Sequence, residues 1–120
     1  MIGVGVDLVD LDRFARVLAR TPSIVERVFT VGERDYCEGK QRVQRYAARF
    51  AAKEAALKAM GCGLGACGWH DIEVTRTEGG APALVVLGRA AQLAAARSVV
   101  AWHVTLSHDG ATATATVIAE

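Results

Sequence analysis

The chain has 120 residues, of which 52% are hydrophobic and 22% charged, a composition typical of one globular domain with its own core. Its formal net charge of +1 argues against nucleic acid or a membrane surface as a partner. No apolar run approaches the roughly 18 residues of a membrane helix, and no secretory signal pattern opens the chain. We therefore expect a single cytoplasmic domain over residues 1–120.

The first predicted element is a β-strand over residues 2–9. Apolar side chains at the even positions from 2 to 8 alternate with Gly3, Gly5 and Asp7, which is the period of a half-buried strand. We expect the apolar face to be buried. The opposite face, lined by glycines, would leave room for a ligand beside Asp7. The alternative is that Asp7 simply lies at a strand end in solvent.

Capping and stop signals divide the next fifty residues into four predicted helices. Asp10 caps the first helix, and Thr30 with Glu33 forms a capping-box pattern for the third. The four helices are predicted to end near Arg20, Phe29, Gly39 and Gly61, and the long fourth helix to begin near Gln41 or Arg42.

The second half of the chain predicts strands at 71–77 and 83–87, joined by a turn at Glu78-Gly79-Gly80. A short helix at 89–97 follows. Strands at 100–107 and 111–119 form a hairpin whose two-residue turn is Asp109-Gly110. Since strands and helices do not alternate regularly, the fold class is α+β, with mixed helices and an antiparallel sheet.

Glu54 and Lys58 lie four residues apart on the long helix and so share one face. A carboxylate can bind a hard cation and an ammonium group a phosphate. Gly61, Gly63 and Gly65 then allow backbone N–H groups to approach an anion. The alternative is an ordinary surface ion pair, worth about 0.2–0.5 kcal/mol, followed by a glycine helix cap.

The other candidates have simple structural explanations when taken alone. Alternation places His108 on the side of Leu106 and predicts a partly buried histidine. Turn chemistry accounts for Asp109, and Arg13 is by default a solvated helix residue.

Three cysteines leave one thiol unpaired under any disulfide arrangement, which fits a reducing compartment. Cys62, Cys67 and His70 form a candidate zinc set. Their spacing matches no common zinc pattern and lacks an evident fourth ligand, so we favour ordinary buried or loop thiols.

Taken together, the motifs resemble those of the holo-acyl-carrier-protein synthases, the small single-domain type of 4′-phosphopantetheinyl transferase. They cover the chain from end to end and in order. The matching residues are Gly5-Val6-Asp7-Leu8-Val9-Asp10 with Arg13, Arg49-Phe50-Ala51-Ala52-Lys53-Glu54-Ala55 with Lys58 and Gly61-Cys62-Gly63, Asp71-Ile72-Glu73-Val74, Gly80-Ala81-Pro82, and Leu106-Ser107-His108.

The resemblance implies transfer of 4′-phosphopantetheine from coenzyme A (CoA) to a serine of an acyl carrier protein, leaving adenosine 3′,5′-bisphosphate. It also implies a homotrimer whose active sites lie at subunit interfaces. Asp7 and Glu54 would bind Mg²⁺, with Mn²⁺ as an alternative, and Lys58 would neutralise the diphosphate.

For the remaining candidates the resemblance implies binding roles. Arg49 would contact a CoA phosphate, and the glycines from Gly61 to Gly65 would flank the nucleotide or the pantetheine arm. At the last turn, Ser107-His108-Asp109-Gly110, the sequence departs from many relatives, and we hypothesise that His108 contacts the phosphate or the adenosine of CoA. Arg13 would contact the acidic helix of the carrier protein. Asp109 is a hypothetical base or orienting residue, and the group that takes the serine proton is left open.

Three other functions compete with this one. They are a CoA-binding module without transfer activity, another trimeric α+β enzyme acting on a diphosphate, and a structural interaction domain. A pure binder has no need of the pair Asp7 and Glu54. A diphosphate cyclase would want clustered histidines and acids, which the sequence lacks. Product formation from CoA would exclude an interaction domain.

Overall fold

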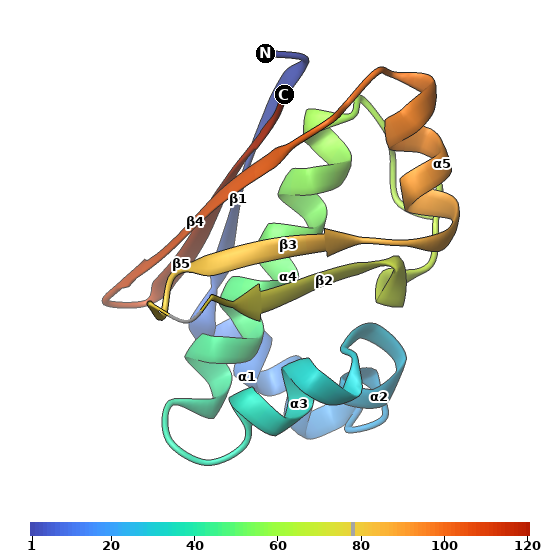
Figure 1. Ribbon diagram of the computed structural model, residues 1–120. Coiled ribbons are helices and arrows are strands. Elements are labelled where there is room, and N and C mark those ends of the chain that lie inside the picture. The colour runs from blue at the N-terminus through green and yellow to red at the C-terminus, as the bar shows by residue number, and fades with distance from the viewer. Residues whose placement is uncertain (78) are drawn as a thin grey trace.

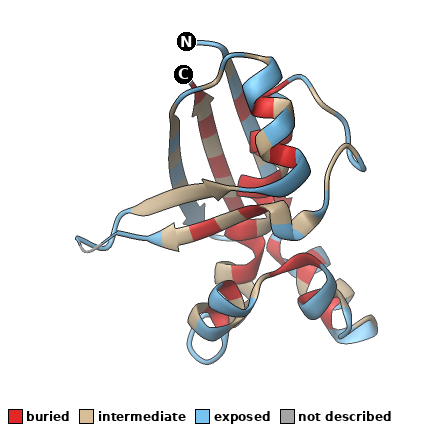
Figure 2. Ribbon diagram, turned by 45° about the vertical axis from the view of Figure 1, so that its right-hand side comes forward, coloured by how far each residue is buried: buried red, intermediate tan, exposed pale blue. Residues whose placement is uncertain are grey.

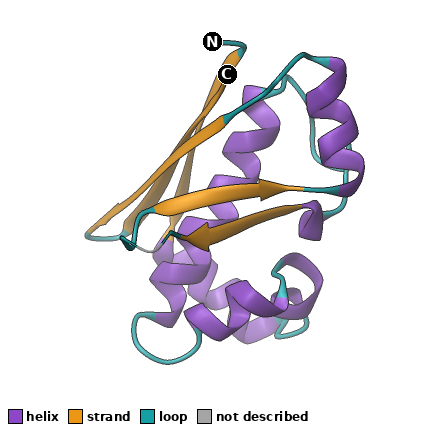
Figure 3. Ribbon diagram, viewed as in Figure 1, coloured by secondary structure: helices purple, strands orange, loops and turns teal. Residues whose placement is uncertain are grey.

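Helices and strands alternate irregularly in the described part of the chain, residues 1–77 and 79–120 of this computed structural model, and the fold is α+β (Figure 3). In chain order the elements are β1 (Gly3–Asp10), α1 (Leu11–Arg20), α2 (Ile24–Val28), α3 (Val31–Cys37), α4 (Arg42–Ala59), the 3-10 helix η1 (Trp69–Asp71), β2 (Ile72–Arg76), β3 (Pro82–Val86), α5 (Gly88–Ala96), β4 (Trp102–Asp109) and β5 (Thr112–Ala119).

The antiparallel pairing that we predicted is confirmed, and the strands are divided between two sheets. The larger has the order β1-β5-β4, and the smaller pairs β2 with β3. Helix α4 lies along one face of the larger sheet, and the β2–β3 hairpin crosses over it (Figure 1). Helices α1, α2 and α3 gather at the end of the molecule opposite the two termini. No helix among the described residues is long and apolar enough to span a bilayer.

The predicted helix signals are confirmed by their hydrogen bonds. The Asp10 carboxylate accepts from the backbone N–H of Arg13 at 3.0 Å. Thr30 and Glu33 form the full capping box at the start of α3. At the end of α4, Gly61 has φ 71°, and the N–H of Cys62 donates to the carbonyl of Leu57 at 2.8 Å. This is a Schellman cap, whose left-handed position is most often a glycine.

The buried face of β1 is the opposite of the one we predicted. The four apolar side chains at positions 2, 4, 6 and 8 are 47%, 48%, 48% and 68% exposed. The glycine face instead packs against α4, where a Cβ atom on Gly3 or Gly5 would lie 1.9 Å or 1.8 Å from a backbone oxygen of that helix. The glycines therefore serve close backbone packing of β1 on α4.

Helix α4 forms the centre of the core because its buried positions are mostly alanines (Figure 2). Small side chains let two neighbouring layers approach the helix from different sides. Along β5, which faces α4, buried residues alternate with partly exposed ones as in any strand with one core face.

Two predicted turns differ in detail. Asp109 is the last residue of β4 and pairs with Thr112, so the two-residue turn consists of Gly110 and Ala111, with Gly110 at φ 56°. The turn predicted at 78–80 includes Glu78, which lies outside the described residues. Gly80 has φ 86° there, and its N–H donates to the Thr77 carbonyl at 2.8 Å.

Candidate active site

The acidic residues Asp7 and Glu54 line one cavity of about 390 Å³, which we call the acid-pair cavity. Asp7 comes from β1 and Glu54 from the middle of α4. The two carboxylates line the same cavity because β1 and α4 pack closely together at Gly3 and Gly5. The cavity's other walls are largely apolar and come from α1, α2 and α4. Its lining also includes Leu8, Val9, Asp10, Arg13, Phe14, Val17, Ile24, Val28, Phe29 and Phe50.

Lys58 is paired with Asp7, and within the described residues no ion pair joins it to Glu54. The Lys58 Nζ lies 3.1 Å from an Asp7 carboxylate oxygen and donates to the Val6 carbonyl at 3.0 Å. The simple surface pair of Glu54 with Lys58 is therefore not the arrangement found. Asp7 lies beside Lys58 and lines the same cavity as Glu54, so the two acids and one base that the family resemblance grouped are neighbours.

Burial raises the pKa of Glu54 above its usual range, the charge of Asp7 raises this pKa further, and Lys58 opposes both effects. Two carboxylates that destabilise one another in a partly buried site suit a divalent cation. Carboxylate oxygens are the ligands that Mg²⁺ prefers, and Mg²⁺ needs few protein ligands. The pair therefore fits the implied metal. Among the described residues, no cluster of three or more His, Cys, Asp or Glu side chains could hold a metal ion.

The raised pKa of Glu54 predicts a pH-dependent stability. Glu54 adds to the free energy of unfolding when it is protonated. This contribution is fully present below the ordinary carboxyl pKa and is lost as pH rises through the raised pKa of Glu54. In EDTA at pH 7 we therefore expect Glu54→Gln, which mimics the protonated acid, to unfold at a higher urea concentration than the unmodified chain. The difference should shrink at pH 4. Equal differences in the urea midpoint at the two pH values would contradict this prediction.

Arginines and a histidine line a second cavity of about 260 Å³, which we call the basic cavity. Arg49 lies in its wall and is only 2% exposed. His108 is exposed at the cavity, so the partly buried histidine that we predicted is wrong. The lining residues are Tyr36, Gln41, Gln44, Arg45, Ala48, Arg49, Arg76, Leu106, Ser107 and His108.

Three guanidinium groups of the basic cavity surround one aromatic ring. The centres of Arg45, Arg49 and Arg76 lie 4.5, 4.4 and 4.9 Å from the centre of the Tyr36 ring. Burial lowers the pKa of Arg49, and its Nε atom is buried without a hydrogen-bond partner among the described residues. Like charges with an unsatisfied donor make a site that an anion would stabilise.

Of these residues, Arg49 and His108 were predicted from the sequence as phosphate-binding candidates, and Tyr36, Arg45 and Arg76 were not. Arg45 precedes Arg49 by four residues and thus shares its helix face, which is a signal we could have used. Nothing local marks Tyr36 or Arg76, because they reach the cavity from α3 and β2.

The two cavities share no lining residue. Arg49 and Glu54 are five residues apart on α4, so their side chains project about 140° from one another around the helix axis. The acid pair and the basic cavity therefore face different directions.

Of the remaining predicted residues, the three glycines and Asp109 lie outside both cavities. Gly61, Gly63 and Gly65 belong to the loop after α4, and a Cβ atom at any of them would meet nothing within 4 Å. Asp109 ends β4 at the exposed tip of its hairpin and does not line the acid-pair cavity. Arg13 does line that cavity, from the first turns of α1.

Cys37, Cys62 and Cys67 all carry free thiols. Burial raises the pKa of Cys37 to about 11 and also raises the pKa of Cys67, so neither is an activated nucleophile at neutral pH.

Comparison with known proteins agrees along the whole chain. The sequence profile of the 4′-phosphopantetheinyl transferase superfamily matches residues 3–116. The holo-[acyl-carrier-protein] synthase of Frankia casuarinae is 51% identical over 120 residues, covering 100% of this chain and 98% of the relative. The holo-[acyl-carrier-protein] synthase from Neisseria meningitidis superposes with a TM-score of 0.91 at 28% identity, covering 100% of this chain and 98% of that one. A Chronobacterium ammoniagenes synthase in complex with CoA superposes with a TM-score of 0.84 at 34% identity, covering 96% and 93%.

Proposed function

This chain belongs to the 4′-phosphopantetheinyl transferase superfamily, and we infer on that premise that it makes holo-acyl-carrier-protein. It transfers the 4′-phosphopantetheine group of CoA to a serine hydroxyl of the apo carrier protein and releases adenosine 3′,5′-bisphosphate. The observation that carries this function is the pair of Asp7 and Glu54 at one cavity, with Lys58 bound to Asp7, in a chain with full-length relatives of that activity.

Asp7 and Glu54 would hold one Mg²⁺ ion, or Mn²⁺ in its place. The bound ion would neutralise charge on the diphosphate oxygens of CoA and orient them. Lys58 lies one helical turn from Glu54 and is partly exposed, so its ammonium group can reach a diphosphate oxygen from the same side.

A base must also take the proton of the attacking serine. Glu54 lies at the acid-pair cavity and is one candidate. Asp109 stays in the proposal only as a residue contributed by a neighbouring subunit, because it lies away from that cavity within its own chain.

The basic cavity suits the 3′-phosphate of CoA. CoA carries two kinds of phosphate, the diphosphate and the 3′-phosphomonoester, and the first is assigned to the acid pair and Lys58. The orphaned Nε of Arg49 and the exposed ring of His108 supply donors for the second. Gly61, Gly63 and Gly65, with open space around them, would let the nucleotide or pantetheine arm lie close to the backbone.

The protein substrate would dock beside the acid-pair cavity. Arg13 lines this cavity and offers a positive charge to an acidic helix of the carrier protein. With a formal net charge of only +1, such attraction has to come from a local group rather than from the whole surface.

The three free thiols support a reducing cytoplasm as the place of action.

We propose a homotrimer in which each active site joins two subunits. The acid-pair and basic cavities of one chain face different directions, although one CoA molecule should contact both kinds of site. The exposed apolar face of β1, formed by Ile2, Val4, Val6 and Leu8, is an unusual surface to leave in water. A ring of three copies would cover this face and bring the acids of one copy to the bases of the next.

A mixing experiment tests the shared site. We expect Asp7→Ala and the double variant Arg76→Ala/His108→Ala each to transfer poorly. When their subunits are exchanged in equal amounts, about one quarter of the interfaces should combine intact acids with intact bases, and activity should return in that proportion. Light scattering should give three times the mass of one chain. A mixture that stays inactive after demonstrated subunit exchange would place the complete site within one chain.

The mass of an apo carrier protein tests the reaction itself. After incubation with this protein, CoA and Mg²⁺, the carrier protein should gain one phosphopantetheine group, and the EDTA control should gain none. Tight CoA binding without any mass gain, over several carrier proteins, would favour the CoA-binding module.

A further inference from the structure

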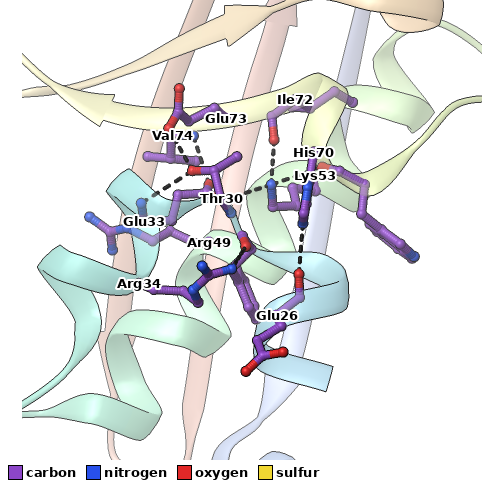
Figure 4. Close-up of polar contacts among 12 residues, drawn as sticks. Glu26, Thr30, Glu33, Arg34, Arg49, Lys53, His70, Ile72, Glu73 and Val74 are labelled. Carbon is purple, nitrogen blue, oxygen red and sulfur yellow. Dashed lines mark hydrogen bonds and ion pairs between the residues drawn. The ribbon is translucent and has the colours of Figure 1, made fainter. Parts of the chain in front are cut away.

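A fully buried ion pair lies at the centre of the molecule and has no part in the proposed reaction (Figure 4). The Lys53 ammonium lies 2.8 Å from a carboxylate oxygen of Glu33, and both side chains have no exposed surface. The same ammonium donates to the carbonyls of Trp69, at 3.0 Å, and Ile72. All three of its N–H groups therefore have acceptors.

Glu33 extends this contact to the smaller sheet. Its second carboxylate oxygen accepts from the backbone N–H of Val74 at 2.8 Å. Its first also accepts from the backbone of Thr30 at 3.0 Å, and the Thr30 hydroxyl donates to Glu73 at 2.5 Å. The pair thus joins α3, α4 and the η1–β2 segment at one point (Figure 4).

The same three elements build the arginine cluster of the basic cavity. Tyr36 follows Glu33 on α3 by one turn, and Arg49 precedes Lys53 on α4 by one turn. Arg76 follows Val74 on β2 by two residues, so it points to the same side of the sheet. All three elements therefore contribute both to the buried junction and to the stack around the Tyr36 ring, and α4 supplies two of its arginines, Arg45 and Arg49. On α3, α4 and β2 the junction and the stack thus lie one helical turn or two strand residues apart.

Stability alone does not account for a charged junction at this place. A buried ion pair is often no more stabilising than apolar side chains of similar volume, but it demands one geometry from its partners. An apolar junction could slide by a fraction of an ångström with little change in energy. The arginines cannot tolerate such a shift, because a phosphate needs hydrogen-bond donors within a narrow range of distance.

We propose that the Lys53–Glu33 pair is a positioning device for the basic cavity and sets the selectivity of the protein for the 3′-phosphate of CoA. This inference rests on the proposed function, which assigns the 3′-phosphate to that cavity. Lys53 and Glu33 touch no substrate and act through Tyr36, Arg49 and Arg76.

The test compares the binding of CoA and of dephospho-CoA, which lacks the 3′-phosphate, by calorimetry on the full chain with Mg²⁺. For Lys53→Met we expect the Kd for CoA to rise about tenfold and the Kd for dephospho-CoA to stay unchanged. Glu33→Gln keeps the side-chain volume and one hydrogen-bond acceptor at the junction but removes the buried negative charge, and circular dichroism establishes that the variant is folded before its binding is measured. We expect it to raise the Kd for CoA by about threefold.

Leu18→Ala is the matched control, since it removes buried volume from α1 and leaves the junction intact. It should lower the unfolding midpoint and leave the ratio of the two Kd values unchanged. The proposal is overturned if the folded Glu33→Gln variant, or a folded Lys53→Met variant, discriminates between the two ligands as well as the unmodified chain does. If the unmodified chain itself does not discriminate, the assignment of the 3′-phosphate to the basic cavity fails instead.

Discussion

Replacing Glu54 with alanine should lower kcat/KM for carrier-protein modification by roughly a thousandfold, a change of about 4 kcal/mol in transition-state stabilisation. Asp7→Ala should have a similar effect. Either change leaves only one carboxylate of the Asp7–Glu54 pair, because the Asp10 carboxylate at the same cavity already caps α1, and one such ligand is too few to hold Mg²⁺ against its water ligands. We would measure the rate of mass gain of an apo carrier protein as a function of the Mg²⁺ concentration.

Asp35→Ala is the control for this loss, since it removes an exposed carboxylate on α3 and changes the net charge equally. Its rate should equal that of the unmodified chain. Glu54→Gln separates charge from shape, and it should be nearly as inactive as Glu54→Ala. A Glu54→Ala variant that keeps Mg²⁺-dependent transfer would refute the assignment of Glu54 as a metal ligand. It would not contradict the transfer reaction itself.

Local sequence patterns predicted the helices and strands to within a few residues at their ends. They sufficed because the residues that start or stop such an element lie close together in the sequence. The capping box at Thr30 and Glu33 and the glycine stop at Gly61 are examples. The spacing of Glu54 and Lys58 placed them on one face of α4, and a strand carrying Asp7 was found by its alternation.

The alternation of apolar and small residues could not show that the glycines of β1 form its buried face. Val4 and Val6 looked like the core face because apolar side chains are usually buried. The actual core face carries Gly3 and Gly5, because α4 lies too close for any side chain. The basic cavity was likewise only half predicted. Arg49 and His108 were found through the family motif, but Tyr36 and Arg76 come together only after α3 and β2 have packed on α4.

This close packing makes Gly5 the position in β1 where an added methyl group should do most harm. A Cβ atom there would lie 1.8 Å from the carbonyl oxygen of Ala55 and 2.9 Å from the amide nitrogen of Ala59. Both are backbone atoms within α4, so no side-chain rotation can relieve the clash, and the strand must move away from the helix. We expect Gly5→Ala to lower the free energy of unfolding by about 3 kcal/mol, measured by urea denaturation.

The displacement should also weaken metal binding, because it separates Asp7 on β1 from Glu54 on α4. Mn²⁺ binding to the folded variant, followed by electron paramagnetic resonance, would show a higher Kd than for the unmodified chain. Gly79→Ala provides the control, since its added Cβ would meet nothing within 4 Å and its backbone is not in the left-handed region. That variant should change the unfolding free energy by no more than about 1 kcal/mol. If Gly5→Ala had the same unfolding free energy and Mn²⁺ affinity as Gly79→Ala, the contact between β1 and α4 would not be what positions Asp7 beside Glu54.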